Sequence, residues 1–159
     1  MLTIIGCGNA TRSDDAVGVL IAQRLRADFD GALPENVRIF DAGTSGIEVM
    51  FHARGTTALI VVDAMNSDAE PGAIFEVPGR ELETIYEPSF SLHDFRWDHA
   101  LAAGRKIFCG AFPEDITVYL IQAGKLDFGL ELTAPVRTAA EKVIARIGER
   151  IRAYGAAKA

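Results

Sequence analysis

Short apolar runs alternate along the chain with segments in which apolar residues recur at helical spacing. Five runs are rich in isoleucine, valine, phenylalanine and tyrosine, a composition typical of strands. Several are apolar at consecutive positions, as strands buried on both faces are. They are LTIIG (2–6), VRIFD (37–41), ALIVVDA (58–64), GAIFEVPG (72–79) and ITVYLIQA (116–123). The pattern predicts a sheet whose central strands are covered on both sides.

Apolar residues repeat at a spacing of three and four in the segments between these runs, which predicts amphipathic helices. Such stripes occupy positions 17–25 and 47–51, and the longest covers 136–151. Thr133 is a candidate N-cap for the last helix, and Pro135 falls in its first turn. Strands and helices therefore alternate, which predicts an α/β fold with helices on both faces of the sheet.

One connection departs from this alternation. Only about nine residues, AMNSDAEPG, lie between Asp63 and the strand expected to start near Gly72. A crossover between parallel strands takes about a dozen residues or more. We therefore expect the strand at 72–79 to run antiparallel to the others, at an edge of the sheet.

Composition and charge exclude several classes of protein. A chain of 159 residues with 49% hydrophobic residues is expected to form one domain over residues 1–159. Its net charge of −6 argues against a nucleic-acid partner. We expect a cytoplasmic protein without a membrane anchor, because no apolar run approaches the roughly 20 residues of a spanning helix. Cys7 and Cys109 belong to no cysteine motif, so no disulfide is expected.

Acidic residues follow three of the expected parallel strands. Asp14 and Asp15 come after the first, Asp41 ends the second and Asp63 ends the third, while His93 lies in the long segment before the last strand. Ligands of such sheets bind at the carboxyl ends of the strands. One acid from each of the three segments is therefore expected to meet the others at one edge of the sheet, within reach of the histidine.

Each of these residues also has a structural explanation. Asp14 is a candidate N-cap, and the dipole of the following helix would stabilise the negative charge of Asp15. Asp41 could form an Asx-turn with the next residues. Asp63 is different, since it follows five apolar residues, and a buried carboxylate is costly unless it is paired or bound to a metal. His99 lies six residues after His93, a poor spacing for one helical face.

A nucleotide site is the first alternative for the glycine-rich loop after the first strand. Gly6, Gly8 and Thr11 nearly match the dinucleotide-binding pattern GxGxxG. However, Thr11 replaces the third glycine, and the carboxylates of Asp14 and Asp15 would repel a pyrophosphate. Two carboxylates and an imidazole suit a divalent ion such as nickel, zinc or cobalt instead.

The motifs together resemble those of the hydrogenase maturation endopeptidases, which trim the C-terminal extension from the large-subunit precursor of nickel-iron hydrogenases. The resemblance rests on five segments in the same order as in that family. They are GCGNATRSDDAVGV (6–19), DAGTSGIEVM (41–50), LIVVDA (59–64), SLHDF (91–95) and FGLELTAPV (128–136).

The resemblance implies a three-layer α/β/α fold of the phosphorylase/hydrolase-like type. Its five-stranded mixed sheet would have the order 2-1-3-5-4, with strand 4 antiparallel. It further implies that Asp15, Asp63 and His93 form a nickel-sensing catalytic site, with Asp41 in a supporting role. The nickel would come with the precursor, which is the expected partner of a monomeric, metal-dependent hydrolase. A nickel-binding accessory protein without hydrolytic activity is the main alternative, and a dinucleotide-binding protein is the other.

Overall fold

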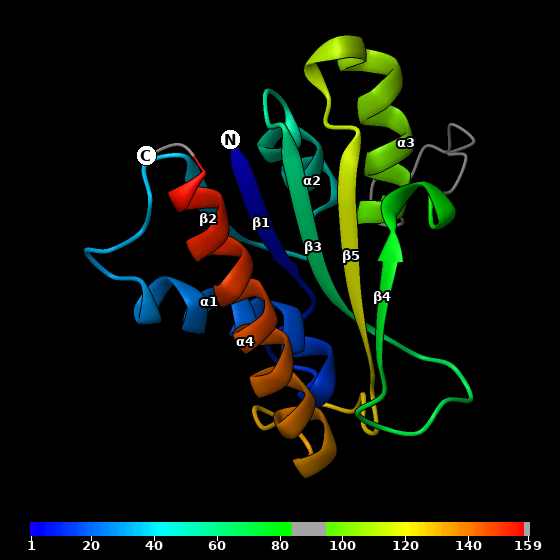
Figure 1. Cartoon of the computed structure of the whole chain (residues 1–159). Coiled ribbons are helices and arrows are strands. Elements are labelled where there is room, and N and C mark those ends of the chain that lie inside the picture. Colours follow the sequence, from blue (N-terminus) through cyan, green and yellow to red (C-terminus); the bar gives the residue numbers. More distant parts are fainter. Residues whose placement is uncertain (84–94, 158–159) are drawn as a thin grey trace.

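The computed structural model describes residues 1–83 and 95–157, which form a five-stranded sheet between two layers of helices (Figure 1). The strands stand in the order β2-β1-β3-β5-β4. All neighbouring strands are parallel except β4 and β5, which are antiparallel. Their bounds are β1 Leu2–Cys7, β2 Val37–Gly43, β3 Ala58–Met65, β4 Ile74–Pro78 and β5 Asp115–Gln122. The predicted strand order and the antiparallel edge strand are confirmed.

Two helices cover each face of the sheet. Helices α1 (Val17–Asp28) and α4 (Ala134–Ala156) pack on the face that is toward the viewer in Figure 1. Helices α2 (Gly46–Ala53) and α3 (Trp97–Phe108) pack on the other face. Within residues 1–83 and 95–157, 3₁₀ segments at Ser13–Ala16, Gly79–Glu81 and Cys109–Ala111 join these elements. None of the helices in the described parts of the chain is long and apolar enough to cross a bilayer.

The central strands contribute to both hydrophobic cores because side chains alternate between the faces of a strand. Ile4 of β1 lies in the core under α1 and α4, whereas Ile5 lies in the core under α2 and α3. Ile60 and Val61 of β3 divide in the same way. All six residues of β1 are buried, which explains why its sequence is apolar at consecutive positions.

A close contact at Gly18 fixes the start of α1 against the carboxyl ends of two strands. A Cβ atom at Gly18 would lie 2.2 Å from the Val62 carbonyl oxygen and 2.3 Å from that of Cys7. Only glycine therefore allows the helix to approach β1 and β3 so closely. The approach places the 3₁₀ turn before α1, with its two aspartates, at the edge of the sheet where β1 and β3 end.

Candidate functional site

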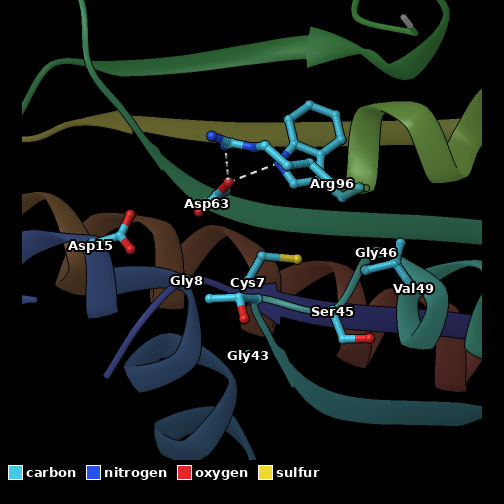
Figure 2. Close-up of a pocket in the computed structure, with 11 residues that line it drawn as sticks. Cys7, Gly8, Asp15, Gly43, Ser45, Gly46, Val49, Asp63 and Arg96 are labelled. Atoms are coloured by element: carbon cyan, nitrogen blue, oxygen red, sulfur yellow. Dashed lines mark hydrogen bonds and ion pairs between the residues drawn. The ribbon is translucent and has the colours of Figure 1, made fainter. Parts of the chain in front are cut away.

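A pocket of about 200 Å³ lies at the carboxyl ends of the three parallel strands β1, β2 and β3 (Figure 2). The N-terminal ends of α2 and α3 complete its wall. The lining residues are Cys7, Gly8, Asp15, Gly43, Thr44, Ser45, Gly46, Val49, Asp63, Arg96 and Trp97. This is the edge at which ligands bind in open α/β sheets.

Asp63 is the most deeply buried acid of the pocket, with only 4% of its surface exposed. Its Oδ1 accepts a hydrogen bond of 2.8 Å from the Ala64 backbone N–H. Its Oδ2 accepts two, one of 2.7 Å from Trp97 Nε1 and one of 3.1 Å from Arg96 Nη2. The carboxyl group is therefore paired with a cation, as the cost of burying a charge requires.

Burial raises the pKa of Asp63 from 3.8 to about 6. The hydrogen bond from Trp97, the charge of Arg96 and the hydrogen bond from Ala64 lower the pKa, but burial outweighs these three effects. The nearby Asp15 carboxylate raises the pKa further. A raised pKa means that the folded protein binds this proton more tightly than the unfolded chain does. Protonated Asp63 therefore stabilises the folded protein. This contribution to the free energy of unfolding is full below pH 3.8 and is lost as the pH rises through about 6.

Asp15 lies in the 3₁₀ turn before α1 and faces the same pocket. Its Oδ2 accepts a 3.0 Å hydrogen bond from the Asn9 backbone N–H, which ties the turn to the loop after β1. Gly8 keeps the space between the two acids open, since a Cβ there would lie 1.8 Å from the Asp15 carbonyl oxygen and 3.7 Å from Asp63 Oδ1. Figure 2 shows both acidic side chains at one end of the pocket, with Ser45 and Val49 at the other.

Asp14, by contrast, belongs to the interior of the protein. Its side chain is fully buried and accepts four hydrogen bonds, from the backbone N–H groups of Gly124, Lys125 and Thr133 and from Thr133 Oγ1. The expectation that Asp14 caps the following helix is therefore wrong, since it joins the turn to the segment before α4. Thr133 is the N-cap residue of α4, but its hydroxyl group donates to Asp14 and does not cap the helix.

Asp41 lies in β2 and is exposed outside the lining of the pocket. Its Oδ1 accepts a 3.0 Å hydrogen bond from the Gly43 N–H, two residues on, as in an Asx-turn. Its Oδ2 accepts a 3.1 Å bond from Gln23 Nε2 of α1. The structure thus brings Asp15 and Asp63 together in the pocket, whereas Asp41, which was expected to join them, lies outside it and binds Gln23 and Gly43.

The predicted ligand His93 lies outside the described residues. His99, which the spacing argued against, accepts a hydrogen bond of 3.4 Å at Nδ1 from the Arg96 backbone N–H in the first turn of α3. His52, near the end of α2, stacks on Phe40. Among residues 1–83 and 95–157 no group of three histidine, cysteine or acidic side chains is placed to hold a metal. Asp15 and Asp63 are the carboxylates in this region that could reach a cation in the pocket.

Cys7 lines the pocket as a buried thiol and not as an activated one. Burial raises its pKa well above the ordinary value, and the Asp63 carboxylate raises it further. A nucleophilic cysteine needs the opposite surroundings, with positive charge or a helix N-terminus that stabilises the thiolate.

Arg96 and Trp97 were not identified from the sequence, although both bind the central acid. They are 33 and 34 positions away from Asp63 along the chain. Nothing local in the stretch FRWDH marks these two side chains as its partners. The one available signal was the buried Asp63 itself, because a buried carboxylate requires donors from elsewhere in the fold.

Comparisons with known proteins agree with this architecture. The profile of the hydrogenase maturation protease family matches residues 19–150. The hydrogenase expression/formation protein HupM of Azotobacter chroococcum is 32% identical over 146 residues, 91% of this chain and 68% of that protein. The hydrogenase 2 maturation protease of Escherichia coli is 28% identical over 97% of this chain and 92% of its own length.

The fold is similar to that of solved structures of the same kind. The hydrogenase maturating endopeptidase HybD from Escherichia coli superposes with a TM-score of 0.79 at 26% identity, over 97% of this chain and 93% of that one. A solution structure of an endopeptidase from Escherichia coli gives a TM-score of 0.77 at 27% identity.

The fold and the pocket define a three-layer α/β protein with a carboxylate site at the end of its parallel strands. Together with the family match, they show that the chain belongs to the hydrogenase maturation protease family, a family of peptidases. The predicted resemblance is confirmed.

Proposed function

We propose that this protein is an endopeptidase that removes the C-terminal extension of a nickel-iron hydrogenase large-subunit precursor after nickel has been inserted. The observation that carries the proposal is the pair of acids, Asp15 and Asp63, which line one pocket of a hydrogenase maturation protease. The partner follows from the names of the relatives, which are hydrogenase maturation proteases and hydrogenase formation proteins.

Nickel enters this proposal as part of the substrate. Carboxylate oxygens and an imidazole suit a divalent ion of this kind, and Asp63 already carries a positive group on Oδ2 in the form of the Arg96 guanidinium. Asp15 and Asp63, together with His93, would contact the nickel that the precursor holds. Only a loaded precursor would then place its scissile bond in the pocket, so the metal would act as the recognition element.

The chemistry of cleavage requires a polarised carbonyl group and a water molecule that loses a proton. The substrate's nickel could polarise the carbonyl group or activate the water. In the free protein Asp63 has a pKa of about 6, so most of this carboxyl group is ionised at neutral pH and available for the contact with the nickel. Asp41, beside the pocket, would support the binding of the substrate chain.

The experiment that tests this function is an intact-mass measurement of a nickel-loaded large-subunit precursor after incubation with the protein. The expected result is a loss of mass equal to one C-terminal peptide, which is recovered as a second product. An unchanged precursor that nevertheless forms a complex with the protein would favour the alternative, a nickel-binding accessory protein without hydrolytic activity.

A dinucleotide-binding function is disfavoured by the environment of the first loop. The N-terminal end of α1, where a pyrophosphate would bind, is preceded by the buried Asp14 and the pocket-lining Asp15. These acids place negative charge where a phosphate group needs positive charge.

A further inference from the structure

Two donors share the Oδ2 atom of Asp63, and they differ in how firmly they are held. The indole of Trp97 is buried, with 7% of its surface exposed, and donates from the first residue of α3. The side chain of Arg96 is 63% exposed, and its guanidinium contacts Asp63 (Figure 2). Trp97 therefore fixes the orientation of the carboxyl group, whereas the ion pair of Arg96 with Asp63 is weakened by solvent.

A second hollow, of about 410 Å³, is also lined by the Arg96 side chain. Asp15, Arg96 and Trp97 line both this hollow and the pocket of the site. Its remaining wall is formed by Ala64, Met65, Asn66, Leu120 and Leu126. The guanidinium can thus leave Asp63 and move into existing space without any change in the backbone of α3.

We propose that Arg96 occupies the cation position at Asp63 in the free protein and yields it to the nickel of the precursor. This inference rests on the proposed function and assigns Arg96 as a residue that determines its specificity. Arg96 is tethered beside Asp63, so it competes at a high effective concentration with any free metal ion. The precursor makes further contacts in addition to that of its metal, and these contacts offset the free-energy cost of displacing the arginine. The protein would thereby discriminate against aqueous nickel.

A titration with Ni²⁺ alone tests the competition directly. Trp97 is the single tryptophan of the chain and donates to Asp63 Oδ2, so its fluorescence reports on this carboxyl group. Arg96→Met is expected to lower the Kd for Ni²⁺ by about two- to fivefold, the factor expected for loss of a partly exposed ion pair. Arg96→Lys keeps the charge and is expected to bind Ni²⁺ nearly as weakly as the wild type.

Two controls separate this competition from a general effect of charge. Arg12→Met removes one positive charge from the loop after β1, where Arg12 lies over the Phe128 ring and not on Asp63. This variant is expected to keep the wild-type Kd. In the double variant Arg96→Met/Asp63→Asn the gain in affinity is expected to disappear, because it acts through Asp63.

The outcomes for Arg96 and for the proposed function are distinguishable. A wild-type or higher Kd in Arg96→Met, with the protein folded as judged by its thermal unfolding, would overturn the role of Arg96 whatever the precursor does. An equal gain in Arg12→Met would overturn it as well. Failure of the wild type to cut any loaded precursor would count against the proposed function, while the Ni²⁺ titration would still decide the role of Arg96.

Discussion

Asp63→Asn is expected to lower the rate of precursor cleavage by about 10³-fold or more, since the proposed contact of this carboxylate with the metal is lost. The protein should remain folded, because asparagine has nearly the same shape. The charge that burial disfavours, as the raised pKa of Asp63 shows, is also removed. From a pKa of about 6 against 3.8, that relief is on the order of 2–3 kcal/mol at neutral pH. It offsets the loss of hydrogen bonding at the amide nitrogen of asparagine, which cannot accept a bond as both oxygens of Asp63 do. The measurements are the cleavage rate by intact mass and the free energy of unfolding in urea.

The pH dependence of cleavage by the wild type tests the role of Asp63 without any substitution. If the ionised form of Asp63 acts, kcat/KM should rise with pH and reach half its maximum near pH 6, the pKa of the free protein. Asp68→Asn removes an exposed carboxylate from the loop between β3 and β4 and is expected to change neither the rate nor its pH profile. Cleavage by Asp63→Asn at the wild-type rate would contradict the assigned site.

Asp14→Ala is expected to destabilise the protein by about 4 kcal/mol, whereas Asp15→Ala should cost about 1 kcal/mol or less. The reason is the number of donors that lose their acceptor. Asp14 accepts four hydrogen bonds in the interior, two of them from Thr133, the N-cap residue of α4. Asp15 accepts one backbone bond in a half-buried position. Equilibrium unfolding in urea measures both changes.

Cleavage activity should depend on Asp15 more than on Asp14, which is the reverse of their effects on stability. Asp15→Ala is expected to stay folded and to lose cleavage of the precursor. Asp14→Asn keeps part of the hydrogen bonding, and the fraction that remains folded is expected to cleave. If Asp14→Ala were as stable as the wild type, the assignment of Asp14 to the interior would be wrong.

The strands, the helices and the antiparallel edge strand could be predicted because their signals are local, whereas the strand order came from the family resemblance. Consecutive apolar residues marked the buried strands, and the short connection after Asp63 identified β4 as antiparallel without any knowledge of its neighbours. The edge of the sheet at which Asp15 and Asp63 meet followed from the parallel direction of β1 and β3. Burial of Asp63 followed from the apolar residues before it.

The roles of the adjacent acids could not be separated in the same way. Asp14 and Asp15 lie in one turn, and both fit the start of a helix by local rules. What distinguishes them is a set of donors 110 to 119 positions further along the chain, which turns Asp14 into an interior residue. Arg96 and Trp97 escaped prediction for the same reason, since their contacts with Asp63 exist only in the folded chain.

In the proposed function, the precursor's nickel admits the substrate to the Asp15–Asp63 pocket. The most direct test compares the initial cleavage rates of one large-subunit precursor prepared with and without nickel, at equal concentrations of the wild-type protein. The loaded precursor is expected to lose its C-terminal peptide, while the nickel-free precursor is expected to keep its full mass. Equal rates of cleavage for both forms would show that nickel is not the recognition element.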